Sequence, residues 1–180
     1  MSESLKIVTL CTGNVARSVM LGCMLTTIGE ASGLDWQVRT AGTHVIEGSA
    51  MSGRTRDALA RIEGLGSQSY SGHRSHQITN DDVRWADVIL ASEADHVHFV
   101  QRNFPQYGDK TVQLAKFARS APLDGPLDRQ LAAVALLTPS PEFDVADPAG
   151  GDQSAYDACA QQLWELSQVF AMLVTEQGIS

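Results

Sequence analysis

The chain has 180 residues, of which 43% are hydrophobic and 19% are charged. A domain of this length buries on the order of 70% of the surface that its unfolded chain exposes, which excludes the small scaffolds that depend on disulfides. The 21 acidic and 13 basic residues give a formal net charge of -8 without any stripe of lysine or arginine, which excludes a protein that coats nucleic acid or an anionic membrane.

The three cysteines, Cys11, Cys23 and Cys159, form no Cys-x-x-Cys pair and have no zinc-ligand spacing. We therefore expect reduced thiols in a cytoplasmic protein. The N-terminus has no basic stretch before a long apolar run, and no apolar run approaches about 18 residues, so neither a signal peptide nor a transmembrane helix is expected. Without repeats or linkers, residues 1–180 are interpreted as one domain that forms a monomer or weak dimer and binds neither nucleic acid nor membranes.

Four short runs of apolar or β-branched residues that end at turn signals are predicted to be strands. They cover residues 5–10, 36–41, 87–91 and 110–115. Apolar residues spaced three and four apart, together with N-cap residues, predict helices between and after these strands. The helices are expected from 17 to a stop at Gly33, over 52–62, from 79, over 96–103, at most one over 127–137, and from the N-cap at 152.

The alternation of strands and helices predicts an α/β fold. We expect a three-layer sandwich in which a four-stranded parallel sheet is flanked by helices. Five of the six prolines lie at positions 122–148, so this stretch is expected to be rich in loops. Ligands of such sheets bind at the carboxyl ends of the strands, and the turn after the first strand is therefore the first candidate site.

That turn contains a cysteine and an arginine with five residues between them, in the sequence Cys11-Thr12-Gly13-Asn14-Val15-Ala16-Arg17-Ser18. A loop that passes from a strand end into a helix start directs successive backbone N–H groups at one point, where the helix dipole also favours an anion. A lone cysteine is more often a small buried residue, but this context favours a phosphate-binding loop made of residues 12–18.

The side chains of this loop suit phosphate chemistry. Gly13 permits a positive φ and Asn14 tolerates one, while the planar fork of Arg17 can grip two phosphate oxygens. Cys11 lies at the focus, where the N–H groups and Arg17 stabilise a thiolate nucleophile, and Ser18 can donate a hydrogen bond to it.

The chain resembles the low-molecular-weight protein tyrosine phosphatase family, whose fingerprint is Cys-x-Gly-Asn-x-Cys-Arg-Ser-Pro at the end of the first strand. The resemblance covers most of the chain, with an apparent insertion around residues 118–140. Further matches are Thr40-Ala41-Gly42-Thr43, Met51-Ser52-x-Arg54-Thr55, His73-Arg74-Ser75-His76-Gln77 and Asp147-Pro148 before Gly150-Gly151.

The resemblance implies that Cys11 attacks phosphorus to give a cysteinyl-phosphate, while Arg17 and the loop amides hold the other oxygens. Asp147 is implied as the general acid that protonates the leaving group and then assists the attacking water. His73 is implied to bond Asn14, and Thr40 to take the place of a loop-bonding serine. The substrate would be a phosphorylated protein or peptide and the product inorganic phosphate, with no metal and no cofactor.

Several positions depart from the family pattern. Ala16 replaces a second cysteine, so no neighbouring thiol can trap oxidised Cys11 as a disulfide. Ala149 follows Asp147-Pro148 where tyrosine-directed members place an aromatic residue, and the segment 44–46 also lacks one. Each missing aromatic residue removes ring stacking worth about 0.5–1.5 kcal/mol from phosphotyrosine binding.

These departures leave the substrate open between two classes. Related phosphatases that act on phosphoarginine share the small residue near the acid, but they carry threonine where this chain has Val15. The sequence therefore favours phosphotyrosine slightly, with phosphoarginine as the alternative. A thiol-relay arsenate reductase and a non-catalytic phosphate-binding module are weaker alternatives, because Cys23 and Cys159 lie on predicted helices and binding alone needs neither Cys11 nor Asp147.

Overall fold

The computed structural model describes residues 4–65 and 72–175, which contain one sheet of four parallel strands. The strands are β1 (Leu5–Cys11), β2 (Trp36–Gly42), β3 (Val88–Ala91) and β4 (Thr111–Gln113). The helices are α1 (Arg17–Ala31), α2 (Gly53–Ala60), α3 (Asn80–Trp85), α4 (Ala94–Asn103), α5 (Leu114–Ser120), α6 (Leu127–Ala135) and α7 (Gln153–Thr175), and two short 3-10 helices are η1 (Pro105–Lys110) and η2 (Pro141–Phe143).

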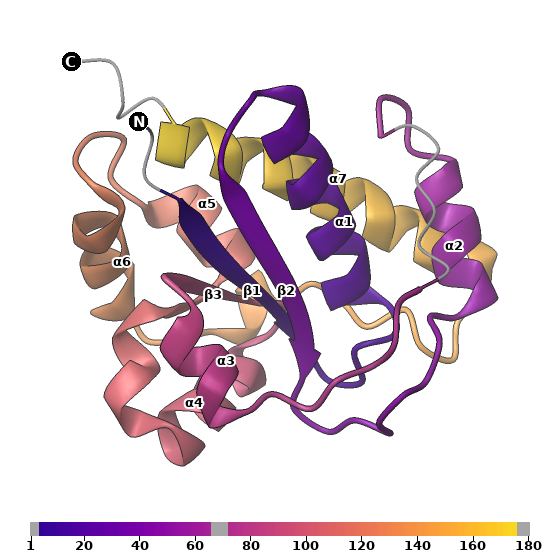
Figure 1. The fold of residues 1–180 in the computed structure, drawn as a ribbon, viewed down its shortest axis with the longest axis horizontal. Coiled ribbons are helices and arrows are strands. Elements are labelled where there is room, and N and C mark those ends of the chain that lie inside the picture. Colours follow the sequence, from indigo (N-terminus) through magenta and orange to yellow (C-terminus); the bar gives the residue numbers. More distant parts are fainter. Residues whose placement is uncertain (1–3, 66–71, 176–180) are drawn as a thin grey trace.

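The strand order β2-β1-β3-β4 puts a switch of direction at the centre of the sheet. The chain leaves β1 toward β2 on one side and then crosses to β3 on the other side, so the carboxyl end of β1 lies at the switch point where α/β sheets bind ligands. Helices α1 and α7 cover one face of the sheet, and α3 and α4 cover the other (Figure 1). The predicted α/β fold with its four-stranded parallel sheet is therefore confirmed.

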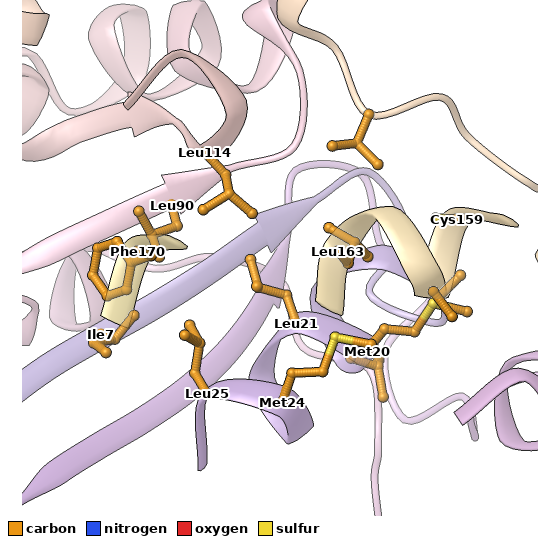
Figure 2. Packing of buried hydrophobic residues seen from close by; sticks show 14 of the residues in the cluster. Ile7, Met20, Leu21, Met24, Leu25, Leu90, Leu114, Cys159, Leu163 and Phe170 are labelled. Atoms are coloured by element: carbon orange, nitrogen blue, oxygen red, sulfur yellow. The ribbon is translucent and has the colours of Figure 1, made fainter. Parts of the chain in front are cut away.

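The larger core lies between the sheet and helices α1 and α7. Leu21 and Leu25 of α1 gather with Leu163 and Phe170 of α7 over the face of β1 that carries Ile7 (Figure 2). All five side chains are fully buried. At about 1.5–3 kcal/mol for each large apolar side chain, this layer anchors α1, the helix that follows the candidate loop.

The alternation of side chains along β1 divides the two cores. Val8 and Leu10 point to the opposite face, where they pack with Ile89 of β3 and Val100 of α4. Thr9 shares the first face, and its hydroxyl donates to the carbonyl of Ser18 at 2.7 Å. By the same alternation Cys11 lies on the α1 side, at the start of the candidate loop.

Most of the predicted elements are present with small shifts at their ends. The N-cap predicted at Ser52 is confirmed, since its hydroxyl accepts from the Thr55 N–H at 3.1 Å. Asp152 likewise accepts from the Ala155 N–H at 3.2 Å before α7. Among residues 4–65 and 72–175, no helix has both the length and the apolar character needed to cross a membrane.

The fourth strand was predicted too long. It ends at Gln113 instead of residue 115, because α5 begins at Leu114 without a side-chain cap that the sequence could reveal. Leu114 and Phe117, one helical turn apart, are fully buried in the larger core and explain why the chain turns helical here. Helix α6 was predicted, but it ends at Ala135, two residues earlier than expected.

Candidate active site

The loop between β1 and α1 is shaped by Asn14. Its φ of 54° is positive and its side chain is fully buried, whereas Gly13, the other residue expected to supply a positive φ, does not adopt one. Asn14 Oδ1 accepts from the His76 N–H at 2.9 Å, and Nδ2 donates to Ser18 Oγ at 2.8 Å and to Thr40 Oγ1 at 3.0 Å. Thr40, predicted as a supporting residue, thus contacts the loop directly.

The carbonyl groups of the loop point outward, where neighbouring segments bind them. Three such bonds come from the residues after β2 and from α2, namely Thr43 N–H to Cys11 O at 3.0 Å, His44 N–H to Thr12 O at 2.9 Å and Thr55 Oγ1 to Val15 O at 3.0 Å. His73 Nε2 donates to Asn14 O at 2.8 Å. In a trans peptide the next N–H points opposite to the carbonyl, so these bonds direct the N–H groups of four loop residues inward. The loop is therefore built to hold an anion.

The close approach of β2 requires a glycine under the loop. A Cβ on Gly42 would lie 2.5 Å from the Thr12 carbonyl oxygen and 3.0 Å from the Asn14 nitrogen, both of which are backbone atoms. No side chain can be accommodated at these distances without moving the loop. Gly42 thus explains physically why the Thr-Ala-Gly-Thr segment after the second strand accompanies the loop sequence.

Cys11 and Ser18 form the centre of the loop. Cys11 is 3% exposed, and its Sγ lies 3.0 Å from Ser18 Oγ. Because Ser18 Oγ already accepts a hydrogen bond from Asn14, the hydroxyl proton of Ser18 is directed to the sulfur, where it stabilises a thiolate. The N-cap of α1, Ala16, provides no side-chain cap, which leaves the helix N-terminus open toward the loop.

Arg17 is 1% exposed and is oriented from several sides. Its Nη1 forms a short ion pair with Glu93 and donates to the Val145 carbonyl at 2.9 Å. Its Nη2 lies 3.2 Å from Asp147 Oδ2 and 3.5 Å from Thr12 Oγ1. The guanidinium is planar, and these contacts hold the buried Arg17 in one orientation from which its fork can bind two phosphate oxygens.

Asp147 lies at the entrance to the loop. Its side chain is 44% exposed, and Oδ1 accepts from the Ala149 N–H at 3.1 Å while Oδ2 faces Arg17. All predicted site residues therefore meet at one place, although Asp147 comes from the distant segment before α7. The exposed side chain of Ile46 and the edge-on contact of His44 with Phe99, whose ring centres are 5.5 Å apart, lie on segments adjoining the loop.

Glu93 and His96, at the start of α4, are site residues that the sequence did not indicate. His96 Nδ1 accepts from the Glu93 N–H at 3.0 Å, so Nε2 carries the proton and donates to Thr12 Oγ1 at 2.9 Å. Both residues follow β3, whose carboxyl end lies beside that of β1. Residues that directly follow a neighbouring parallel strand lie at the same edge of the sheet, and this rule could have indicated Glu93 and His96.

His96 is expected to make the stability of the protein depend on pH. Burial, and then the positive charges of Arg17 and His44, lower the pKa of His96 from 6.5 to about 3. Between pH 6.5 and about 3, His96 binds a proton in the unfolded chain but not in the folded chain. The free energy of unfolding therefore falls as the pH is lowered through this range. One such proton contributes a slope that approaches about 1.4 kcal/mol per pH unit.

Urea unfolding at a series of pH values measures this effect. The variant His96→Gln keeps an N–H donor for Thr12 but cannot titrate, so its curve should fall less steeply than the wild-type curve. His98→Gln, on the same helix but 41% exposed in its side chain, is the control and should leave the slope unchanged. Parallel curves for wild type and His96→Gln would show that His96 is not held neutral.

Comparison with known proteins places the chain in a family. The family model described as low molecular weight phosphotyrosine protein phosphatase matches residues 6–130. The chain belongs to this family. The match includes the loop from Cys11 to Ser18, whereas Asp147 lies beyond it and is placed at the site by the fold.

Relatives cover nearly the whole chain. A protein-arginine-phosphatase of Geobacillus stearothermophilus is 30% identical over 173 residues, which are 96% of this chain and 98% of that protein. The crystal structure of a low molecular weight protein tyrosine phosphatase from T. tengcongensis has a TM-score of 0.75 at 26% identity and covers 93% of this chain and 97% of its own. The structure of a Cys-to-Ser mutant of an arginine phosphatase, with a phosphorylated active-site serine, has a TM-score of 0.73 at 25% identity and covers 93% of each chain. This chain is therefore a phosphatase of the low molecular weight family.

Proposed function

We propose that this phosphatase transfers the phosphoryl group of a phosphorylated protein first to Cys11 and then to water. The observation that carries the proposal is the meeting of three groups at one loop: the Cys11 thiol, the buried Arg17 fork and the Asp147 carboxyl 3.2 Å from that fork. The phosphorylated active-site serine of the related mutant supports a nucleophile at the position of Cys11.

In the first step the Cys11 sulfur attacks phosphorus in line, so an S–P bond forms as the bond to the leaving atom breaks. The N–H groups of residues 12–18 and the Arg17 fork hold the three remaining oxygens, whose charge is spread in the transition state. Arg17 Nη2 passes from Asp147 to a phosphate oxygen. The protonated carboxyl of Asp147 then lies beside the leaving atom and gives it a proton.

In the second step the same carboxylate acts as a base. Asp147 takes a proton from water, the water oxygen attacks phosphorus, and the S–P bond breaks to release inorganic phosphate. Cys11 leaves as a thiolate that accepts the Ser18 hydrogen bond. Asn14, with Thr40 and His73 bonded to it, keeps the N–H groups in place through both steps.

Phosphoarginine is the substrate class that the relatives favour. A curated relative that spans nearly the whole chain is named a protein-arginine-phosphatase. Ala149, two residues after the acid, is exposed and offers no ring on which the phenol of phosphotyrosine could stack. We therefore place phosphoarginine ahead of phosphotyrosine, reversing the order that the sequence suggested.

Phosphotyrosine stays the second candidate because of Val15. This half-buried, β-branched and apolar side chain occupies the loop position where arginine phosphatases carry threonine. The arsenate-reductase alternative is weakened by the other two cysteines, since burial raises the pKa of both Cys23 and Cys159 to about 12 and keeps them protonated. Protonated thiols are poor relays of a disulfide.

Two peptides of one sequence, carrying either phosphoarginine or phosphotyrosine, test this proposal. Phosphate release should give a kcat/KM at least about tenfold higher for the phosphoarginine peptide, and Val15→Thr should widen that ratio without loss of folding. A tenfold preference for phosphotyrosine would reverse the substrate assignment. Well-folded wild type that releases phosphate from neither peptide nor an aryl phosphate would leave a phosphate-binding module as the function.

A further inference from the structure

The segment that carries Asp147 is tied to the sheet upstream of the acid. Val145 and Pro148 are buried, but Ala146 and Asp147 between them are exposed. Apart from the local Ala149 N–H, the Asp147 carboxyl contacts Arg17, whose Nη2 must turn to the phosphate when substrate binds. The place of Asp147 in the reacting complex therefore depends on what holds the backbone before it.

Gln113, at the end of β4, holds that backbone. Its side chain is 2% exposed and pairs with Ser140 in both directions, since Nε2 donates to the Ser140 carbonyl at 3.0 Å and Oε1 accepts from the Ser140 N–H at 2.9 Å. Nε2 also donates to Asp144 Oδ1 at 2.9 Å. The buried amide of Gln113 thus attaches the segment before Asp147 to the end of β4.

Asp144 carries this constraint to the active site. Its Oδ1 also accepts from the Ala94 N–H, the first of α4, at 2.7 Å. The next residue, Val145, donates its N–H to the Ser92 carbonyl at 2.8 Å and accepts Arg17 Nη1 at 2.9 Å. The segment is therefore bound to the end of β4 at Ser140 and Asp144. At Val145 it is bound to Arg17 and to the residue that follows β3.

We propose that Gln113 is a positioning residue for the general acid: through Ser140 and Asp144 it fixes the segment that sets Asp147 beside the leaving group. The inference rests on the proposed role of Asp147. A displacement of about 1 Å in a catalytic group can cost about 100-fold in rate, so a buried amide outside the cleft can govern proton transfer without touching substrate. Cys11 makes no bond with Gln113. Arg17 contacts the segment only at Val145, which Ser92 also holds, and at Asp147 itself, so phosphate binding should be unaffected.

The leaving group separates this role from a structural one. The variant Gln113→Glu has the same shape but turns an oxygen toward the Ser140 carbonyl and Asp144, which it repels. We expect kcat/KM for phenyl phosphate, whose phenol needs a proton, to fall by about tenfold to 100-fold. The value for 2,4-dinitrophenyl phosphate, whose leaving group needs none, should fall by less than about threefold.

Two further measurements define the role. The affinity for inorganic phosphate should stay unchanged, and Gln113→Glu should have little added effect in an Asp147→Asn background, because both act on the same proton transfer. Gln130→Glu is the matched control: Gln130 is also fully buried, and its amide donates to Pro122 O and Leu173 O at 2.9 and 3.0 Å, away from the acid segment.

Each result bears on the proposal. Equal losses on both aryl phosphates, a loss of phosphate affinity, or the same leaving-group pattern in Gln130→Glu would show that Gln113 is only structural. Gln113→Ala, compared with Gln130→Ala, repeats the test if the buried glutamate prevents folding. If wild type hydrolyses neither aryl phosphate, the proposed function itself fails, which is a distinct result from a failure of the positioning role.

Discussion

Replacing Cys11 by serine is expected to abolish turnover while the protein stays folded. An alcohol in this loop is a far weaker nucleophile than a thiolate, because the surrounding N–H groups and Ser18 are donors that stabilise an anion and none of them is a base that removes a proton. Loss of the nucleophile should lower kcat by about 10^5-fold or more. The measurement is phosphate release from an aryl phosphate, with the thermal unfolding midpoint as the check on folding.

The same variant should reveal the covalent step. If slow transfer to the introduced serine occurs, intact-mass spectrometry should detect a stable phosphoryl adduct, as the phosphorylated serine of the related Cys-to-Ser mutant suggests. Cys23→Ser is the matched control. Cys23 is a half-buried residue of α1 that packs against the core, so this variant should keep kcat near the wild-type value. Turnover that survives Cys11→Ser, or is lost in Cys23→Ser, would contradict the assignment of the nucleophile.

The phosphate loop could be predicted from sequence because its determinants are contiguous. A strand end, a Cys-to-Arg spacing, a residue suited to positive φ and a helix start all lie within residues 11–18. The helix-breaking and capping signals at Gly33 and Ser52 were equally local and were confirmed. Signals that are local in the sequence therefore suffice to predict the phosphate loop and the strand and helix next to it.

Contacts that depend on the order of the strands could not be predicted in this way. Glu93 and His96 reach Arg17 and Thr12 only because β3 lies beside β1, and Gln113 reaches the acid segment only because β4 is next in the sheet. Asp147 was found by family resemblance, since an Asp-Pro pair alone is a common turn signal. Helix α5 was missed for the same reason. It has no side-chain cap, and it is stabilised by the burial of Leu114 and Phe117 among residues that are distant in the sequence.

The composition of the phosphate loop explains how a chain with a net charge of -8 can bind phosphate. Backbone N–H groups and one buried arginine supply the positive potential. Glu93 orients that arginine, and Asp147 faces the leaving group as the proposed proton donor. Global charge acts over longer distances and is screened within about 8 Å at physiological ionic strength. The site is therefore electrostatically independent of the acidic surface.

Replacing Arg17 by lysine is expected to remove most of the activity although the charge is kept. Lysine offers a point charge on a flexible stem, so it cannot bind two phosphate oxygens in one plane while it also faces Glu93 and Val145. An arginine that stabilises the charge of a transferring phosphoryl group contributes about 10^3- to 10^5-fold to kcat, and a loss in that range is expected for kcat/KM. Inorganic phosphate should also bind more weakly, as isothermal titration calorimetry can measure.

A control separates catalysis from stability in this variant. Arg56→Lys, at an exposed position of α2, makes the same chemical change and should leave both kcat/KM and phosphate affinity unchanged. Arg17→Ala is a less informative variant, because removing one partner of a buried ion pair costs about 3–5 kcal/mol and leaves Glu93 uncompensated beside the loop. Near-wild-type kcat/KM in folded Arg17→Lys would mean that a single positive charge suffices at this site, and the bidentate grip on phosphate would have to be abandoned.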